Sequence, residues 1–120
     1  MPDQNLRISS QPLNTYSGIV SLAGRLDAGS LDAFEDEVNG LIDSGVTSLG
    51  IDAVQLDGIS SAGLGAFVDL ASLLRERQGL FMLCIATPEL TDLVDMLGLR
   101  DILGVTDNID TVKRELMKPK

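Results

Sequence analysis

The sequence predicts an α/β fold in which a mixed, mostly parallel β-sheet with an N-terminal hairpin is covered by about four helices. Apolar runs of strand length alternate with segments whose apolar residues repeat at helical spacing, an order typical of parallel sheets. Two β-type runs open the chain and are joined by a short loop of turn-forming residues. The 120 residues, 44% of them apolar, suffice for one compact core, and we expect a single domain over residues 1–120.

The first half of the chain supplies the hairpin, one helix and one buried strand. We expect the hairpin strands at Leu6–Ser10 and Gly18–Ala23. A long helix is predicted over Ser30–Ser44, and a strand over Val46–Ile51 follows the stop at Gly45. The apolar stripe of the helix consists of Leu31, Phe34, Val38, Leu41 and Ile42, and its early turns carry Asp32, Glu35, Asp36 and Glu37. These acidic side chains complement the positive end of the helix dipole.

The second half predicts three helices and two strands. Helices are expected over Ser61–Arg77, from Pro88 with Thr87 as cap, and over Asp107–Met117 with Asp107 or Asn108 as cap. The apolar stripe of the first of these helices is Leu64, Phe67, Val68, Ala71 and Leu74. The strands are expected at Leu80–Ala86 and Ile102–Val105, and Asp57-Gly58 is expected to form a tight turn.

Composition argues against several classes of function. The net charge is −9, and no stretch concentrates Lys or Arg, so we expect no binding to nucleic acid. An acidic surface instead favours encounter with a basic protein partner. With no His and a single Cys, most metal sites and the usual Ser-His or Cys-His nucleophile pairs cannot form, and we expect no catalytic residue, metal or cofactor. The chain also lacks a phosphate-cradling Gly-rich signature.

Two further expectations concern the thiol and the compartment. Cys84 lies in an apolar run, where we expect a buried thiol that behaves as a small hydrophobe. The first residues show no basic segment followed by an apolar one, and no apolar run approaches membrane-spanning length. We therefore expect a cytoplasmic protein that does not insert into a membrane.

The segment Gln55–Gly65 is the most informative part of the chain, because it enters a helix through two serines and several small residues. A serine in the first turn of a helix satisfies a free backbone N–H, and the positive end of the helix favours negative charge. Ser61 can therefore accept a phosphate without melting its own helix. The helix face opposite the apolar stripe carries Ser61, Gly65, Asp69 and Ser72, whose small side chains allow another chain to approach closely. The alternative is that Ser61 acts only as an N-cap.

From Ile19 to Gly98 the chain resembles the anti-sigma factor antagonist family, the stand-alone STAS domains. Three motifs carry the resemblance, in the family's order: the strand end Val20–Asp27, the strand Leu49–Asp52 with the serine loop Ile59–Gly65, and the strand Gly79–Ala86 with the helix Pro88–Leu99. The second motif is the most specific, because it is similar to the family's phosphorylation loop.

The resemblance implies a phosphoacceptor at Ser61, with Ser60 as second choice. In the family the residue before the phosphorylated serine is usually Asp, whereas this chain has Ser60 there. The resemblance also sets Asp27 and Asp52, which we expect at strand ends, near the serine loop on one rim of the sheet. There each carboxylate either holds its own loop or contacts a partner. The partner-binding residues that we predict are Asp27, Ser60, Ser61, Ala62, Gly63, Gly65 and Asp69.

The resemblance implies a regulatory function. When unphosphorylated, the protein is expected to bind an anti-sigma factor that is also a serine kinase, and so to release a sigma factor. Phosphorylation at Ser61 ends the binding, a phosphatase restores it, and ATP and Mg²⁺ belong to the kinase. The alternative is a STAS adaptor subunit of a membrane transporter assembly, of ABC or permease type, which never turns over phosphate. Ser60 in place of Asp keeps this alternative open.

Overall fold

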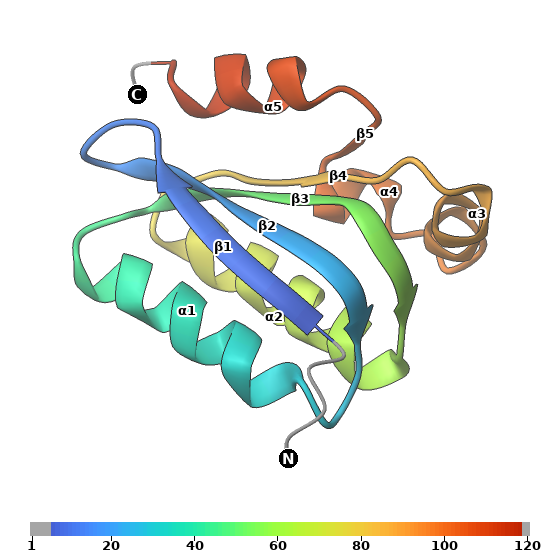
Figure 1. Cartoon of the computed structure of the whole chain (residues 1–120). Coiled ribbons are helices and arrows are strands. Elements are labelled where there is room, and N and C mark those ends of the chain that lie inside the picture. Colours follow the sequence, from blue (N-terminus) through green and yellow to red (C-terminus); the bar gives the residue numbers. More distant parts are fainter. Residues whose placement is uncertain (1–5, 119–120) are drawn as a thin grey trace.

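In the computed structural model, which describes residues 6–118, five strands form one mixed sheet in the order β1-β2-β3-β4-β5 (Figure 1). The strands are β1 (Leu6–Pro12), β2 (Ser17–Leu26), β3 (Ser48–Ile59), β4 (Phe81–Cys84) and β5 (Val105–Thr106). β1 pairs antiparallel with β2, and all other neighbours are parallel. The predicted fold class is confirmed. The expectation of no leader segment falls on residues 1–5, which lie outside the described part.

Five helices accompany the sheet within residues 6–118. They are α1 (Leu31–Asp43), α2 (Ser61–Glu76), α3 (Pro88–Met96), the single turn α4 (Arg100–Leu103) and α5 (Ile109–Leu116). α1 and α2 lie against one face of the sheet and α5 lies against the other, as Figure 1 shows. No helix in the described residues is both long and apolar enough to cross a membrane.

The core is divided by the sheet into two unequal parts. The larger part fills the space between the sheet and the α1/α2 layer and includes Phe34, Phe67 and Phe81. Their rings form a chain of contacts, with centroids 5.6 Å and 6.2 Å apart. The smaller part lies under α5 and consists of Ile19, Cys84, Val112 and Leu116. The predicted burial of Cys84 is confirmed.

β3 continues eight residues beyond its predicted end at Ile51, and the predicted turn at Asp57-Gly58 is wrong. Two register shifts place extra residues in β3 relative to β2, first between Asp52 and Gln55 and then between Leu56 and Gly58. Asp57 is therefore the extra residue of a bulge rather than part of a turn. Leu56 is buried in the core, so pairing with β2 and side-chain burial keep the chain extended despite its turn-forming residues.

The last predicted strand is also wrong over most of its length. Arg100–Leu103 forms α4, and Gly104 ends this turn with a left-handed φ of 55°. Only Val105 and Thr106 pair with β4. A short apolar run has no period that separates a strand from a helical turn. Burial of Leu103 decides here for the helix, because the helical turn directs that side chain into the core.

The helix caps refine the predicted boundaries. Asn108, one of the two predicted caps, precedes α5 and its side-chain oxygen accepts the N–H groups of Asp110 and Thr111 at 2.9 Å and 3.4 Å. Thr87 occupies the cap position of α3, as predicted, but its side chain makes no capping hydrogen bond.

Candidate functional site

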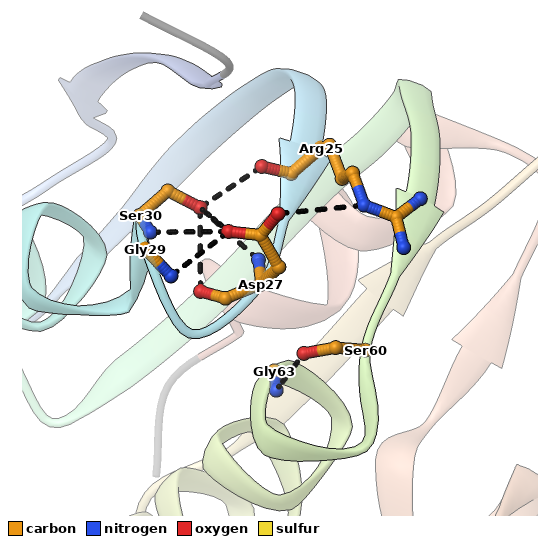
Figure 2. Close-up of polar contacts among 6 residues, drawn as sticks. All are labelled: Arg25, Asp27, Gly29, Ser30, Ser60 and Gly63. Atoms are coloured by element: carbon orange, nitrogen blue, oxygen red, sulfur yellow. Dashed lines mark hydrogen bonds and ion pairs between the residues drawn. The ribbon is translucent and has the colours of Figure 1, made fainter. Parts of the chain in front are cut away.

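β3 delivers the chain to Ser60 at the carboxyl edge of the sheet. The N–H of Ser60 donates to the carbonyl of Leu26 at 2.9 Å, so the ends of β2 and β3 stay bonded where α2 begins. Ser60 has extended backbone angles, and its Oγ accepts the N–H of Gly63 at 3.2 Å (Figure 2). Ser60 is therefore the N-cap of α2.

Ser61 is the first helical residue of α2 and is exposed. Its hydroxyl has no hydrogen-bond partner among residues 6–118. The alternative that Ser61 serves only as the N-cap is wrong, because Ser60 performs that task. The Ser61 side chain is left available at the positive end of a sixteen-residue helix.

The other predicted partner-binding residues of α2 divide into exposed and buried positions. Ala62, Gly65 and Asp69 are exposed, and a Cβ on Gly65 would meet open space. Gly63 is buried, and a Cβ there would lie 2.9 Å from the carbonyl oxygen of Leu26. Gly63 therefore allows α2 to approach the sheet closely and offers little surface to a partner.

Asp27 organises the loop between β2 and α1. Its Oδ1 accepts the N–H groups of Gly29 and Ser30 at 3.0 Å and 3.3 Å. The Ser30 hydroxyl donates to the carbonyl of Arg25 at 2.9 Å, and the Asp27 N–H donates to Ser30 Oγ at 3.1 Å (Figure 2). The interpretation that Asp27 holds its own loop is confirmed. A contact of Asp27 with a partner stays a prediction.

Arg25 makes an ion pair with this loop. Its Nε lies 3.4 Å from Asp27 Oδ2, with more than half of the Arg25 side chain exposed. Exposed ion pairs of this kind contribute little stability. The hydrogen bonds between backbone groups and the Asp27 and Ser30 side chains therefore stabilise the loop, and Arg25 adds a positive charge to the rim.

Asp52 does not lie on this rim, and that prediction is wrong. It pairs with Ser21 and Cys84 inside the sheet, seven residues before the end of β3, and its Oδ1 accepts the N–H of Val54 at 3.2 Å. The error follows from the unexpected length of β3.

Burial, followed by the charges of Asp52 and Asp107, raises the pKa of Cys84 to about 11, so the thiol stays protonated at neutral pH.

A groove of about 150 Å³ lies between α1 and α2, and sequence reasoning missed it. Its lining combines apolar side chains with three polar ones: Phe34, Val38, Ala66, Leu70 and Leu73 with Glu35, Asn39 and Asp69. Asp69 follows Ser61 and Gly65 at intervals of four residues, so one stripe of α2 runs from the free hydroxyl to the groove. The sequence shows that α1 carries acidic residues, but only the packing of the two helices places Glu35 of α1 in the same groove as Asp69.

The fold and the serine loop define a STAS domain. The sequence profile of the STAS domain family matches residues 9–112, and the chain belongs to this family. Within the described residues no group of side chains is arranged to hold a metal ion.

The chain is similar to proteins described as anti-sigma factor antagonists. The chain is 30% identical over 90 residues to BtrV of Bordetella bronchiseptica, a candidate anti-sigma factor antagonist, covering 75% of this chain and 78% of that protein. A candidate antagonist from Thermotoga maritima has a similar structure, with a TM-score of 0.79 at 17% identity over 92% of this chain and 95% of that one. The structure of the antagonist SpoIIAA in its unphosphorylated form is also similar, with a TM-score of 0.77 at 16% identity over 95% of this chain and 100% of that one.

The two serines are expected to differ in their effect on stability. Replacement of the cap in Ser60→Ala should lower the free energy of unfolding by about 1 kcal/mol, because the Gly63 N–H loses its partner. Ser61→Ala should change it by less than about 0.5 kcal/mol. Urea denaturation of both variants measures the difference, and equal losses would contradict the assignment of the cap.

The two glycines of the same helix provide a second matched pair. Gly63→Ala should destabilise the protein by roughly 1–3 kcal/mol, because its Cβ presses on the backbone of β2. Gly65→Ala meets open space and should stabilise the helix by about 0.5–1 kcal/mol. Opposite signs in thermal or urea unfolding are the expected result, and a harmless Gly63→Ala would refute the close approach.

Proposed function

We propose that this protein is an anti-sigma factor antagonist whose binding is switched by phosphorylation of Ser61. In its unphosphorylated form it binds an anti-sigma factor that is also a serine kinase, and this binding releases a sigma factor. One observation carries the proposal: Ser61 presents an exposed hydroxyl without a partner among residues 6–118, beside a cap that Ser60 already completes. Membership of the STAS family and the similarity to BtrV support the same function.

The surface around Ser61 suits close docking of a protein. Ala62 and Gly65 are exposed and have little or no side chain, so a partner backbone can approach the first turns of α2. The stripe ends at Asp69 and at the groove, whose apolar floor and acidic rim fit a basic side chain with an aliphatic stem. The net charge of −9 favours encounter with a basic partner.

The switch is a phosphoryl transfer from ATP that the kinase holds with Mg²⁺. Ser61 Oγ attacks the γ-phosphorus, the bond from that phosphorus to the bridging oxygen of ADP breaks, and the hydroxyl proton passes to a base of the kinase. The product carries about −1.5 to −2 charges at neutral pH. The helix N-terminus tolerates this charge within the domain, whereas a closely docked surface would have to bury it. Because about 1.4 kcal/mol is tenfold in affinity, a small part of that penalty suffices for release.

The environment of the two serines favours Ser61 over Ser60 as acceptor. Ser60 Oγ accepts the Gly63 N–H, and Ser60 is less exposed than Ser61. A kinase acting on Ser60 would have to displace the cap of α2, whereas Ser61 requires no rearrangement. Removal of the phosphate by a phosphatase would return Ser61 to the binding form. We place this cycle in the cytoplasm, with no nucleic-acid contact by this chain.

Ser60, in the place of the Asp that is usual in the family, favours a second candidate function. As an adaptor subunit of a membrane transporter assembly, the domain would use the same small-residue surface in a permanent contact with a transport ATPase or permease. No phosphorylated form would then exist in cells. Intact-mass measurement of protein from growing and stressed cells separates the two functions, because a phosphate localised to Ser61 is expected only for the switch.

A charge at Ser61 should weaken binding of the kinase. In a titration of the kinase, Ser61→Asp is expected to lower affinity at least about tenfold, because it places an anion inside the contact. Ser61→Ala should bind within about twofold of wild type, since a small side chain still fits. Equal affinities of wild type and Ser61→Asp would remove Ser61 from the switch.

The acidic rim of the groove should contribute through charge. Asp69→Asn is expected to weaken kinase binding about threefold at low salt, with a smaller loss at high salt, because the lost attraction is screened. Asp110→Asn on α5 removes the same charge from the opposite face and serves as the control. Parallel salt curves for the two variants would place the groove outside the contact.

A further inference from the structure

A hollow of about 530 Å³ opens on the face of the sheet that carries α5, away from the α1/α2 layer. Its walls come from β1, β2, β3 and the start of α5. Six polar side chains line it: Arg7, Ser9, Ser21, Asp52, Gln55 and Asp107. The apolar side chains on this face are Ala23, Val54 and Ile109, whereas Ile8 and Leu22 also border the hollow but pack their side chains into the larger core on the other face. No function proposed above uses this hollow.

Strand register brings the polar groups together in two rows. Ser9 pairs with Ser21, and Ser21 pairs with Asp52, so these three residues lie side by side across three strands. In the next row Arg7 pairs with Ala23, and Ala23 pairs with Gln55. The bulge between Asp52 and Gln55 lets both Val54 and Gln55 line the hollow, although they are adjacent in sequence.

The polar side chains of the hollow have almost no partners within residues 6–118. Those of Arg7, Ser9, Ser21, Gln55 and Asp107 make no hydrogen bond or ion pair there. Asp52 accepts only the N–H of Val54, two residues along its own strand. Elsewhere on the surface, in contrast, Arg100 and Asp95 form a two-bond pair at 2.7 Å and 3.0 Å. The donors and acceptors around the hollow are thus free for a ligand.

The charges of the hollow are separated. Asp52 pairs with Cys84 of β4, and Asp107 directly follows Thr106, which pairs with Cys84 from β5, so both acidic residues lie toward the β4 side of the hollow. Arg7 lies on β1, two strands from Asp52 and two residues further along, which corresponds to about 12 Å between their Cα atoms. Arg100 adds a charge near Asp107, but Asp95 already engages its guanidinium. The hollow therefore has a negative end, a positive end and a partly apolar floor.

We propose that this hollow binds a small zwitterion whose ammonium and carboxylate groups are joined by a short aliphatic chain. The ammonium group faces Asp52 and Asp107, and the carboxylate faces Arg7. The aliphatic chain lies over Ala23 and Val54, and the hydroxyls of Ser9 and Ser21 bond to the polar ends. Two carboxylates against one guanidinium make the ammonium the stronger anchor.

The probe is 6-aminohexanoate, titrated into ¹⁵N-labelled full-length protein and followed by amide chemical shifts. Saturable shifts are expected at the lining strands β1, β2 and β3 at concentrations below about 10 mM. Hexanoate and hexylamine, which each carry one of the two charges, should bind at least about tenfold more weakly. Absence of saturable shifts, or equal binding of hexylamine, would overturn the proposal.

Charge variants assign the two ends. Asp52→Asn and Arg7→Gln should each lower the affinity for 6-aminohexanoate at least about tenfold. Asp52→Asn should weaken the binding of hexylamine more than that of hexanoate. Asp110→Asn and Arg114→Gln on α5 remove the same charges outside the lining and should leave binding unchanged. The amide spectrum of each variant reports that it is folded. If the lining and control variants lose the same affinity for 6-aminohexanoate, the effect comes from the overall charge of the protein and the proposed site is rejected.

Discussion

The contact between the first turn of α2 and the last residue of β2 is the constraint on which the site depends. Leu26 accepts the N–H of Ser60 through its carbonyl, and its side chain and carbonyl both touch the space where a Cβ on Gly63 would lie. This contact sets where α2 begins and makes Ser60 the cap. Ser61 follows directly after this hydrogen-bonded cap residue, and its side chain is consequently exposed.

The length of β3 separates two surfaces of different chemistry. At its carboxyl end the strand leads into Ser60 and Ser61, from which one stripe of α2 runs to the groove lined by Glu35 and Asp69. In its middle it presents Asp52 to the hollow on the α5 side. The proposed phosphorylation site at Ser61 thus lies well away from the proposed ligand site in the hollow, and each proposal can be tested without disturbing the other.

Most elements could be predicted because their signals are local. The helical spacing of Leu64, Phe67 and Leu74 predicts a helix without knowledge of the rest of the fold, and all three side chains are buried. The errors arose where distant partners decide. Asp57-Gly58 has turn chemistry, yet pairing with β2 makes it part of a bulge. The apolar run at Ile102 forms a helical turn because Leu103 enters the core in that conformation.

The sequence by itself determined the α/β class, the acidic surface, the STAS resemblance and the presence of a hydroxyl at the start of a helix. These properties follow from residue order, composition and short-range periodicity. Only the tertiary structure decided which serine caps α2, that Asp27 holds its own loop, and that Arg7, Asp52 and Asp107 share one hollow. Each of these depends on the register between strands and on helix packing, which bring together residues that are far apart in the chain.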